Sequence, residues 1–156
     1  MLFGWSILLI THGILAVFLV GAITHQAVGV AWPVAKRGSG FFSAVRGVNG
    51  MSYTNTVILL FVLTFILGCV IYPTYRLNVR TVLQEYRLFK PEGSFELKEH
   101  FMATGLMLLP AYWYFWRKAN EDNRAVRAGL TVILAFDVWW GFMTGHVINN
   151  IRGFGS

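Results

Sequence analysis

The stretch GSFELKEHFMATGLMLLPAYWYFW, residues 93–116, decides the fold of this chain. Its first turns carry Glu96 and Glu99, whose carboxylates suit the positive end of a helix dipole, and Ser94 there favours a helix N-cap. From residue 101 onward the stretch contains no charged side chain, and two cations follow directly after it. An uncharged segment that ends in a Tyr/Trp cluster beside cations predicts a helix that crosses a bilayer, with its aromatic side chains at the far interface.

Composition places the whole chain in a membrane. Of its 156 residues 56% are hydrophobic and only 13% are charged, and the mean hydropathy is +0.56. A soluble domain of this length carries roughly a quarter charged residues. The net charge of +6 raises the possibility of a nucleic-acid partner, but the cations stand at the ends of apolar segments and not along one solvated face. We therefore expect no nucleic acid, and assign the cations to membrane topology and to contacts with lipid or cofactor phosphates and carboxylates.

Four apolar segments of this kind occur along the chain, and we predict that each forms a membrane-spanning helix. No basic region precedes the first one, and it is too long for the apolar part of a signal peptide, so we expect it to be retained. Because proline interrupts helices, we end the second span at Pro73. The predicted fold is an all-α integral membrane four-helix bundle, a single transmembrane domain over residues 1–156 with both termini on the same side. The spans cover about residues 4–30, 54–73, 95–116 and 125–149, with a surface loop at 31–52 and an interfacial amphipathic or extended segment at 74–93.

The cations also suggest the orientation of this bundle. We call the side with both termini the X end and the opposite side the Y end. The 13 Lys and Arg residues divide almost evenly, with six at the X end and seven at the Y end. The first helix has no cation before it, and residues 117–127 are dense in cations, so the positive-inside rule favours a cytoplasmic Y end and termini on the non-cytoplasmic side. We expect a bacterial inner membrane or an equivalent membrane.

All four histidines lie within or at the ends of the predicted spans. Ionisable residues inside a membrane are costly and usually face the bundle interior, so each is a candidate for function or, alternatively, for hydrogen bonding between helices. At a rise of about 1.5 Å per residue, His12, His100 and His146 all fall in the X half, whereas His25 falls near the Y end. We therefore predict that three histidines on three helices converge in one half of the membrane.

This pattern of histidines suits the axial ligation of a b-type haem, which needs two imidazoles on facing helices at similar depth. Any pair among the three X-half histidines meets that need. The haem propionates need cations near the membrane surface, and the X end offers Arg76, Arg80 and Arg152. We expect one haem and not two, because His25 has no histidine partner near the Y end and points about 140° away from His12 around the first helix.

The same histidines also allow a non-haem metal site. Together with Glu99, His12, His100 and His146 supply the nitrogen and oxygen ligands that iron, copper or zinc accept. No ligand motif such as HExxH is present, so spacing alone does not favour this alternative.

Asp137 is the other exceptional residue, because it lies near the middle of the fourth predicted span. A charged aspartate at that depth costs roughly 2.5–3.5 kcal/mol on insertion scales, so we expect it to be protonated, paired or in contact with internal water. His12 lies at a comparable depth and is the expected partner, with Tyr112 or Tyr114 as alternatives. Such a pair orients an imidazole behind a metal or passes protons to a quinone, whereas a neutral Asp137 would simply bond a neighbouring helix.

Four spans, with His12, His100 and His146 near one face and arginines beside them, resemble small b-type cytochrome membrane subunits, such as the membrane anchors of quinone-linked dehydrogenases and related four-helix haem proteins. The resemblance implies a membrane subunit of a respiratory or photosynthetic-type electron-transfer complex, which binds one haem b and exchanges electrons with quinone or a partner redox protein. Catalysis is then expected largely in other subunits. Two alternatives stay open: a cofactor-free membrane scaffold or assembly subunit, and a small metal-dependent membrane enzyme that uses the histidines with Glu99.

Overall fold

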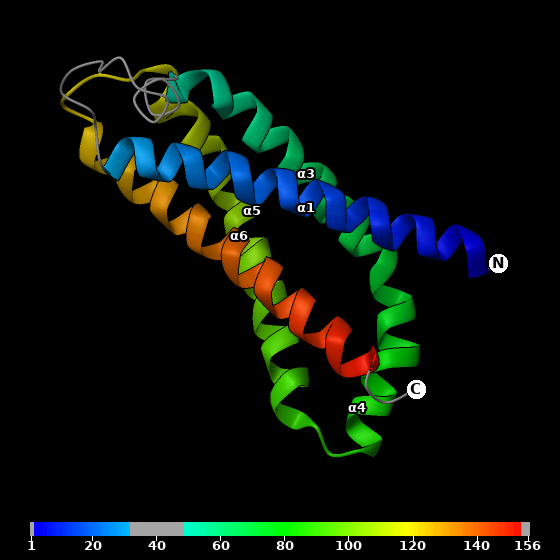
Figure 1. The fold of residues 1–156 in the computed structure, drawn as a ribbon. Coiled ribbons are helices and arrows are strands. Elements are labelled where there is room, and N and C mark those ends of the chain that lie inside the picture. The colour runs from blue at the N-terminus through cyan, green and yellow to red at the C-terminus, as the bar shows by residue number, and fades with distance from the viewer. Residues whose placement is uncertain (1, 32–48, 154–156) are drawn as a thin grey trace, which may run out of the picture.

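The computed structural model of this chain describes residues 2–31 and 49–153, and every regular element in them is a helix. Four helices of the described residues are long, with 25 to 30 residues each, and consecutive ones run in alternating directions (Figure 1). The all-α prediction is therefore confirmed. The elements are α1 (Leu2–Ala31), α3 (Gly50–Thr74), the π-helix η1 (Tyr75–Arg80), α4 (Thr81–Glu85), α5 (Phe89–Arg117) and α6 (Arg124–Gly153).

Within residues 2–31 and 49–153, three segments are long and apolar enough to cross a membrane: Gly4–Ala31, Gly50–Glu85 and Arg124–Asn150. Their outward faces carry large apolar side chains such as Ile10 and Phe18, which are 61% and 62% exposed. Exposed apolar surface on that scale suits lipid and not water, so these helices support a bilayer as the environment. A fourth crossing by α5 stays a prediction, since its first turns carry several charged residues.

The helix that forms the second predicted span does not end at Pro73, the predicted membrane boundary. The helix instead continues through η1 and α4 to Glu85 as one segment of 36 residues. Pro73 removes one backbone donor, and the π-helix that starts at Tyr75 follows directly. The Tyr75 N–H turns back to the carbonyls of both Ile71 and Tyr72. These bonds reach three and four residues back, so helical hydrogen bonding resumes two residues after Pro73 and the chain keeps its helical course.

α4 ends in a Schellman motif with an arginine where glycine is usual. The Leu88 N–H donates to the Leu83 carbonyl at 2.7 Å, and the Arg87 N–H donates to the Gln84 carbonyl at 3.0 Å. Arg87 adopts the left-handed conformation that this motif needs, with φ of 56°. The motif reverses the chain within three residues and sets α5 beside α4.

α5 begins earlier than the sequence suggested. Its first residue is Phe89, and Pro91 sits in its first turn, where a missing N–H has no intrahelical partner to lose. The prediction that Ser94 caps the helix is wrong, because Ser94 lies inside it and donates its hydroxyl to the Lys90 carbonyl at 2.9 Å. The Schellman turn, and not a polar cap, decides where the helix starts.

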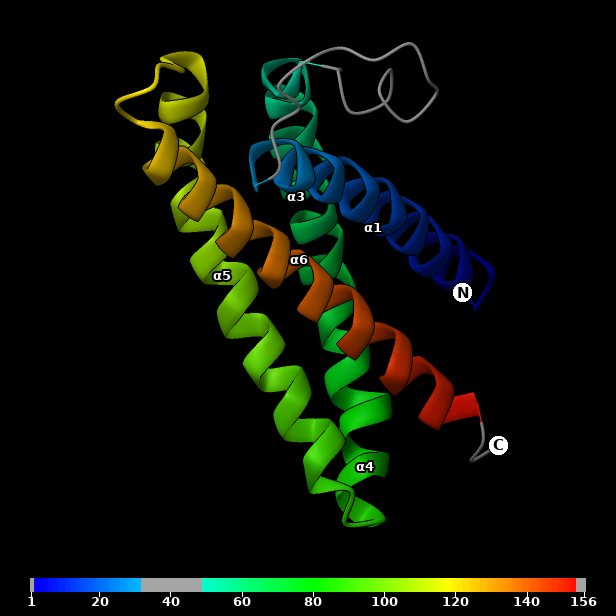
Figure 2. The same ribbon diagram turned by 60° about the vertical axis from the view of Figure 1, so that its left-hand side comes forward.

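The main buried core lies in the Y half, where α1 and α5 end and α3 and α6 begin. Toward the X end the amino-terminal part of α1 and the carboxy-terminal part of α6 diverge from each other (Figures 1 and 2). Residues 32–48, most of the predicted surface loop, lie outside the described residues. The core residues are Leu19, Val20, Ile23, Val57, Phe61, Leu109, Tyr112, Trp116, Leu134, Ala135 and Val138.

Candidate functional site

His100 lies on the face of α5 that points away from the core. The buried face of this helix carries Gly105, Leu109 and Tyr112. His100 precedes Gly105 by five residues, which turns it about 140° from that face. Its side chain is exposed, and its Nδ1 lies 2.8 Å from the Glu96 carbonyl of the same helix.

His146 is also exposed. Its ring stacks on Phe142, one turn earlier in α6, at a centroid distance of 6.4 Å. Its Nε2 lies 3.3 Å from the Asn150 side-chain nitrogen. Both contacts stay within α6.

Among the described residues no three His, Cys, Asp or Glu side chains gather in a way that could hold a metal ion. The predicted set of His12, His100 and His146 with Glu99 therefore has no support as a metal site within one copy of the chain. A haem needs only two imidazoles, but the outward position of His100 does not suit a haem enclosed by these helices. Haem ligation by this chain stays a prediction.

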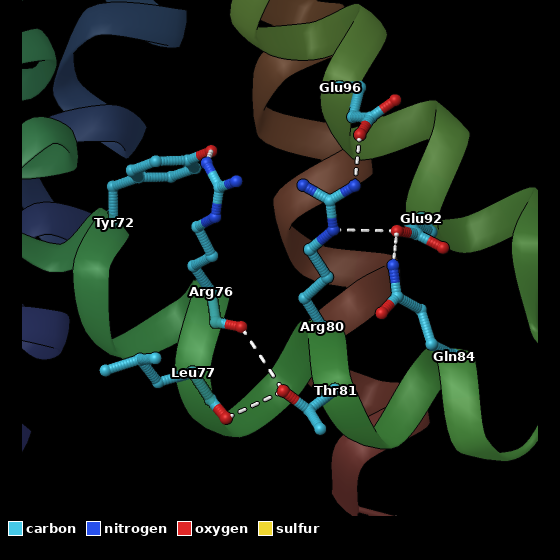
Figure 3. A network of polar contacts seen from close by, with 8 residues as sticks. All are labelled: Tyr72, Arg76, Leu77, Arg80, Thr81, Gln84, Glu92 and Glu96. Carbon is cyan, nitrogen blue, oxygen red and sulfur yellow. Dashed lines mark hydrogen bonds and ion pairs between the residues drawn. The ribbon is translucent and has the colours of Figure 1, made fainter.

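Two of the three arginines assigned to haem propionates have other partners (Figure 3). Arg80 Nε lies 2.7 Å from Glu92 Oε1, and a second guanidinium nitrogen lies 2.8 Å from Glu96 Oε1. Gln84 also donates to Glu92, at 2.5 Å. Arg80 therefore ties the α3–η1–α4 segment to α5.

Arg76 likewise has a local partner. Arg76 donates to the Tyr72 hydroxyl at 3.3 Å, one turn away in its own helix. The Arg152 side chain lies outside the described residues. The structure thus gives Arg76 and Arg80 local partners and leaves the predicted role of Arg152 untested.

His12 is the X-half histidine that reaches the interior. Its Nδ1 is shielded from solvent and has no hydrogen-bond partner. The ring lies beside the backbone of Thr64, and its Cε1 is 3.5 Å from the position that a Cβ on Gly68 would take. The ammonium group of Lys98, on α5, is close enough to act on the charge of the imidazole. The His12 side chain therefore points from α1 toward α3, within electrostatic range of Lys98 on α5.

Asp137 is buried, with 3% of its surface exposed. Its Oδ2 lies 3.2 Å from the position of a Cβ on Gly105, and the Phe61 ring meets the same position. This oxygen has no hydrogen-bond partner in the structure. The expected bond to His12 or Tyr112 is not formed in the described part of the chain, and Tyr114 is exposed on another face. Asp137 is confirmed as an interior residue, but the predicted pairing is not.

A buried polar network near the Y end escaped the sequence analysis. The Tyr112 hydroxyl donates to Gln26 Oε1, and Gln26 Nε2 donates to the Gly50 carbonyl at 2.8 Å and contacts Thr54 Oγ1 at 3.3 Å. Gln26 is 1% exposed and Tyr112 is fully buried. The signal was a single glutamine in a long apolar segment, and we overlooked it because it carries no charge.

A groove between α1 and α3 is the second feature that the sequence did not reveal. It has a volume of about 660 Å³ and opens on the outer face of the helix pair. At its Y end the rings of His25 and Tyr53 stack at a centroid distance of 5.0 Å. The groove is lined by Val17, Phe18, Gly21, Ala22, His25, Tyr53, Thr56 and Leu60.

The depth of these residues gives the groove two different ends. His25 and Tyr53 lie where α1 ends and α3 begins, close to the expected membrane surface. Val17 lies eight residues earlier, about 12 Å deeper along α1, and Leu60 lies beside it on α3. The described lining contains no Lys, Arg, Asp or Glu. The groove therefore offers neutral hydrogen-bonding groups at the membrane surface and apolar walls below them.

Comparison with known proteins assigns no relative: no family model matches the sequence, and neither a curated protein nor a solved structure shows significant similarity to it.

Proposed function

We propose that this chain is a membrane subunit of an electron-transfer complex and that a quinone binds in the groove between α1 and α3. The observation that carries the proposal is the order of groups along the groove, from the His25–Tyr53 ring pair to the apolar wall at Val17 and Leu60. A lipid-soluble quinone has the same order, with a neutral ring at one end and a hydrocarbon tail at the other.

The chemistry of each end supports this ligand. Quinone carbonyl oxygens accept hydrogen bonds, and an imidazole, a phenol and the Thr56 hydroxyl are donors that serve them. The flat rings of His25 and Tyr53 also suit contact with a flat quinone ring. An anionic phospholipid headgroup would instead need cations, and the described lining supplies none. Because the groove opens outward, a quinone can enter it laterally from the bilayer.

Haem b belongs to the same proposal, in a position shared with another subunit. The Nδ1 of His100 is held by the Glu96 carbonyl, which leaves Nε2 directed outward. Metal-ligating histidines commonly donate their other ring N–H to a carbonyl in this way. A haem bound there would supply one-electron transfer, and its second ligand would come from a neighbouring protein. We place catalysis in such partners and treat this chain as a non-catalytic subunit.

The quinone site is tested by photolabelling of the purified protein in nanodiscs with an azido-benzoquinone that carries a decyl tail. We expect labelled peptides from the groove segments of α1 and α3, and competition by unlabelled decyl-benzoquinone but not by added phospholipid. Gly21→Leu should suppress the labelling, because a Cβ at Gly21 meets no neighbour and the new side chain projects without strain. Gly13→Leu, on the same helix outside the groove, is the matched control. Equal labelling of both variants would refute the site.

The haem is tested independently by the absorption spectrum, oxidised against dithionite-reduced, of the complex purified from its own membrane. We expect sharp α and Soret bands that disappear in His100→Ala and persist in His25→Ala. Loss in His25→Ala with retention in His100→Ala would overturn the X-half placement.

A cofactor-free scaffold is the second candidate, and the Gln26–Tyr112 network favours it. There the buried polar groups find their partners inside the chain, as expected where polar residues serve packing between helices. The absence of both quinone labelling and haem bands in an assembled complex would select this function.

A further inference from the structure

Among the buried polar atoms of the described residues that lack hydrogen-bond partners, three lie near one another in depth and come from three different helices. They are His12 Nδ1 on α1, Thr64 Oγ1 on α3 and Asp137 Oδ2 on α6. An unpaired buried donor or acceptor costs about 1–3 kcal/mol, so native structures rarely leave one without protein or water. Three of them in one region indicate a shared partner.

The structure places these atoms in sequence along the bundle axis. His12 lies beside the Thr64 backbone and against Gly68, one turn further toward the X end. Asp137 and Phe61 meet over Gly105, and Phe61 precedes Thr64 by three residues. At about 1.5 Å of rise per residue, Thr64 lies within roughly one helical turn of both His12 and Asp137 in depth. Spacing of this order suits water molecules that bridge polar groups.

The two ends of this sequence of atoms differ. Toward the X end α1 and α6 diverge (Figure 2), and the ammonium group of Lys98 on α5 lies within electrostatic range of His12. Toward the Y end Asp137 faces the packed core, in which Val57, Leu109 and Leu134 are at most 5% exposed. Water therefore has a polar approach from one end and an apolar barrier at the other.

We infer that water enters the bundle from the X end, past His12 and Thr64, and reaches the carboxyl group of Asp137 in the middle of the membrane. This X-half inlet lets the carboxyl group exchange a proton with water on one side of the membrane alone. The inference is independent of the quinone groove, which lies on the outer face of α1 and α3, and it stands or falls by a separate experiment.

The experiment uses the single cysteine of the chain. Cys69 is exposed, so Cys69→Ser gives a background free of thiols. Thr64→Cys then places one thiol of similar size in the inlet, and Val57→Cys places one in the apolar core of the same helix as the matched control. The proteins are reconstituted in vesicles, and a cleavable tag on the C-terminus reports which end faces outward. The probe is a small, charged, membrane-impermeant methanethiosulfonate.

We expect Thr64→Cys to be labelled when the X end faces the probe and not when the Y end does, and Val57→Cys to be unlabelled from both sides. Thr64→Cys that is folded but unlabelled from either side, or labelled only from the Y end, would overturn the inlet. If the cysteine variant does not fold, hydroxyl-radical footprinting of the unmodified protein decides. Oxidation at His12 and Phe61, beside the proposed water, supports the inlet, and protection equal to that of Leu109 and Leu134 refutes it.

Discussion

The Y half and the X half of this bundle solve the problem of buried polar groups in opposite ways. In the Y half, Gln26, Tyr112 and Thr54 satisfy one another inside a packed core. In the X half, His12 and Thr64 each have a polar atom without a partner, between helices that spread apart. The turn between α4 and α5, which we call the hairpin tip, is held by the ion pairs of Arg80. Close packing excludes water and demands internal partners, whereas spread helices leave room for water or another subunit. The Y half is thus held together by internal hydrogen bonds, whereas the X half keeps His12 Nδ1 and Thr64 Oγ1 without such partners.

Glycine substitutions should reveal the largest difference between the halves. A Cβ on Gly105 would come within 2.7 Å of the Phe61 ring and 3.2 Å of Asp137 Oδ2, whereas a Cβ on Gly145, in the X half of α6, meets nothing within 4 Å. We expect Gly105→Ala to lower the free energy of unfolding by about 1–3 kcal/mol through overpacking. Gly145→Ala should raise it by up to about 1 kcal/mol through helix propensity.

Thermal or denaturant unfolding in detergent, followed by circular dichroism, measures both effects. If Gly105→Ala proves as stable as Gly145→Ala, the helices in the Y half are not held at the spacing described here.

Removal of one hydroxyl should have the next largest effect. Tyr112→Phe keeps the ring but leaves the buried Gln26 side chain without its donor, which should cost about 1–3 kcal/mol. Tyr114→Phe on the same helix removes an exposed hydroxyl whose partner is the Lys118 ammonium at 3.4 Å, and should change stability by less than about 0.5 kcal/mol. The same unfolding assay compares the two variants. Equal losses would mean that the Y-half network adds nothing beyond an exposed contact.

The smallest global effect is expected at the hairpin tip. Arg80→Gln should loosen the connection between η1 and α5 by removing the pairs with Glu92 and Glu96, while the Y-half core stays intact. Limited proteolysis should then cut near residues 85–89 faster than in the parent protein, with little change in the unfolding midpoint. Arg76→Gln is the control, because the Arg76 side chain donates to Tyr72 one turn away and makes no described contact with α5. A large drop in the midpoint for Arg80→Gln would show that the two halves unfold as one unit.

The difference in cutting should also depend on salt. The pair with Glu96 is the more exposed of the two, and exposed ion pairs are screened at high ionic strength, so raising the salt concentration should bring the parent protein closer to Arg80→Gln. Proteolysis of the two proteins at low and high salt measures this effect. A constant difference would indicate that Arg80 acts through packing of its aliphatic stem and not through charge.

Long elements were predictable because they depend on local composition. An apolar segment such as the first one contains enough residues to cross a bilayer as a helix, and the structure forms a helix there. A local signal misled at Ser94, because the Schellman turn decides where α5 begins, and Pro73 does not stop its helix, which continues as η1. The burial of Asp137 among the helices agrees with the expectation that an ionisable residue within a span faces the bundle interior. The direction of a side chain around its helix was not predictable. His100 was therefore expected to face the interior of the bundle, but it lies on the outer face of α5.

The sequence by itself determined that this chain is helical, that its helices suit a bilayer, and that His12 and Asp137 sit deep within them, because hydropathy and helical rise are properties of each segment alone. Only the tertiary structure decided which side chains share a neighbourhood. It joined Gln26 to Tyr112, brought His25 to Tyr53, and gave Arg80 to Glu92 and Glu96. Such contacts depend on the rotation and crossing of one helix against another, which arise from how whole faces pack and not from the spacing within any one of them.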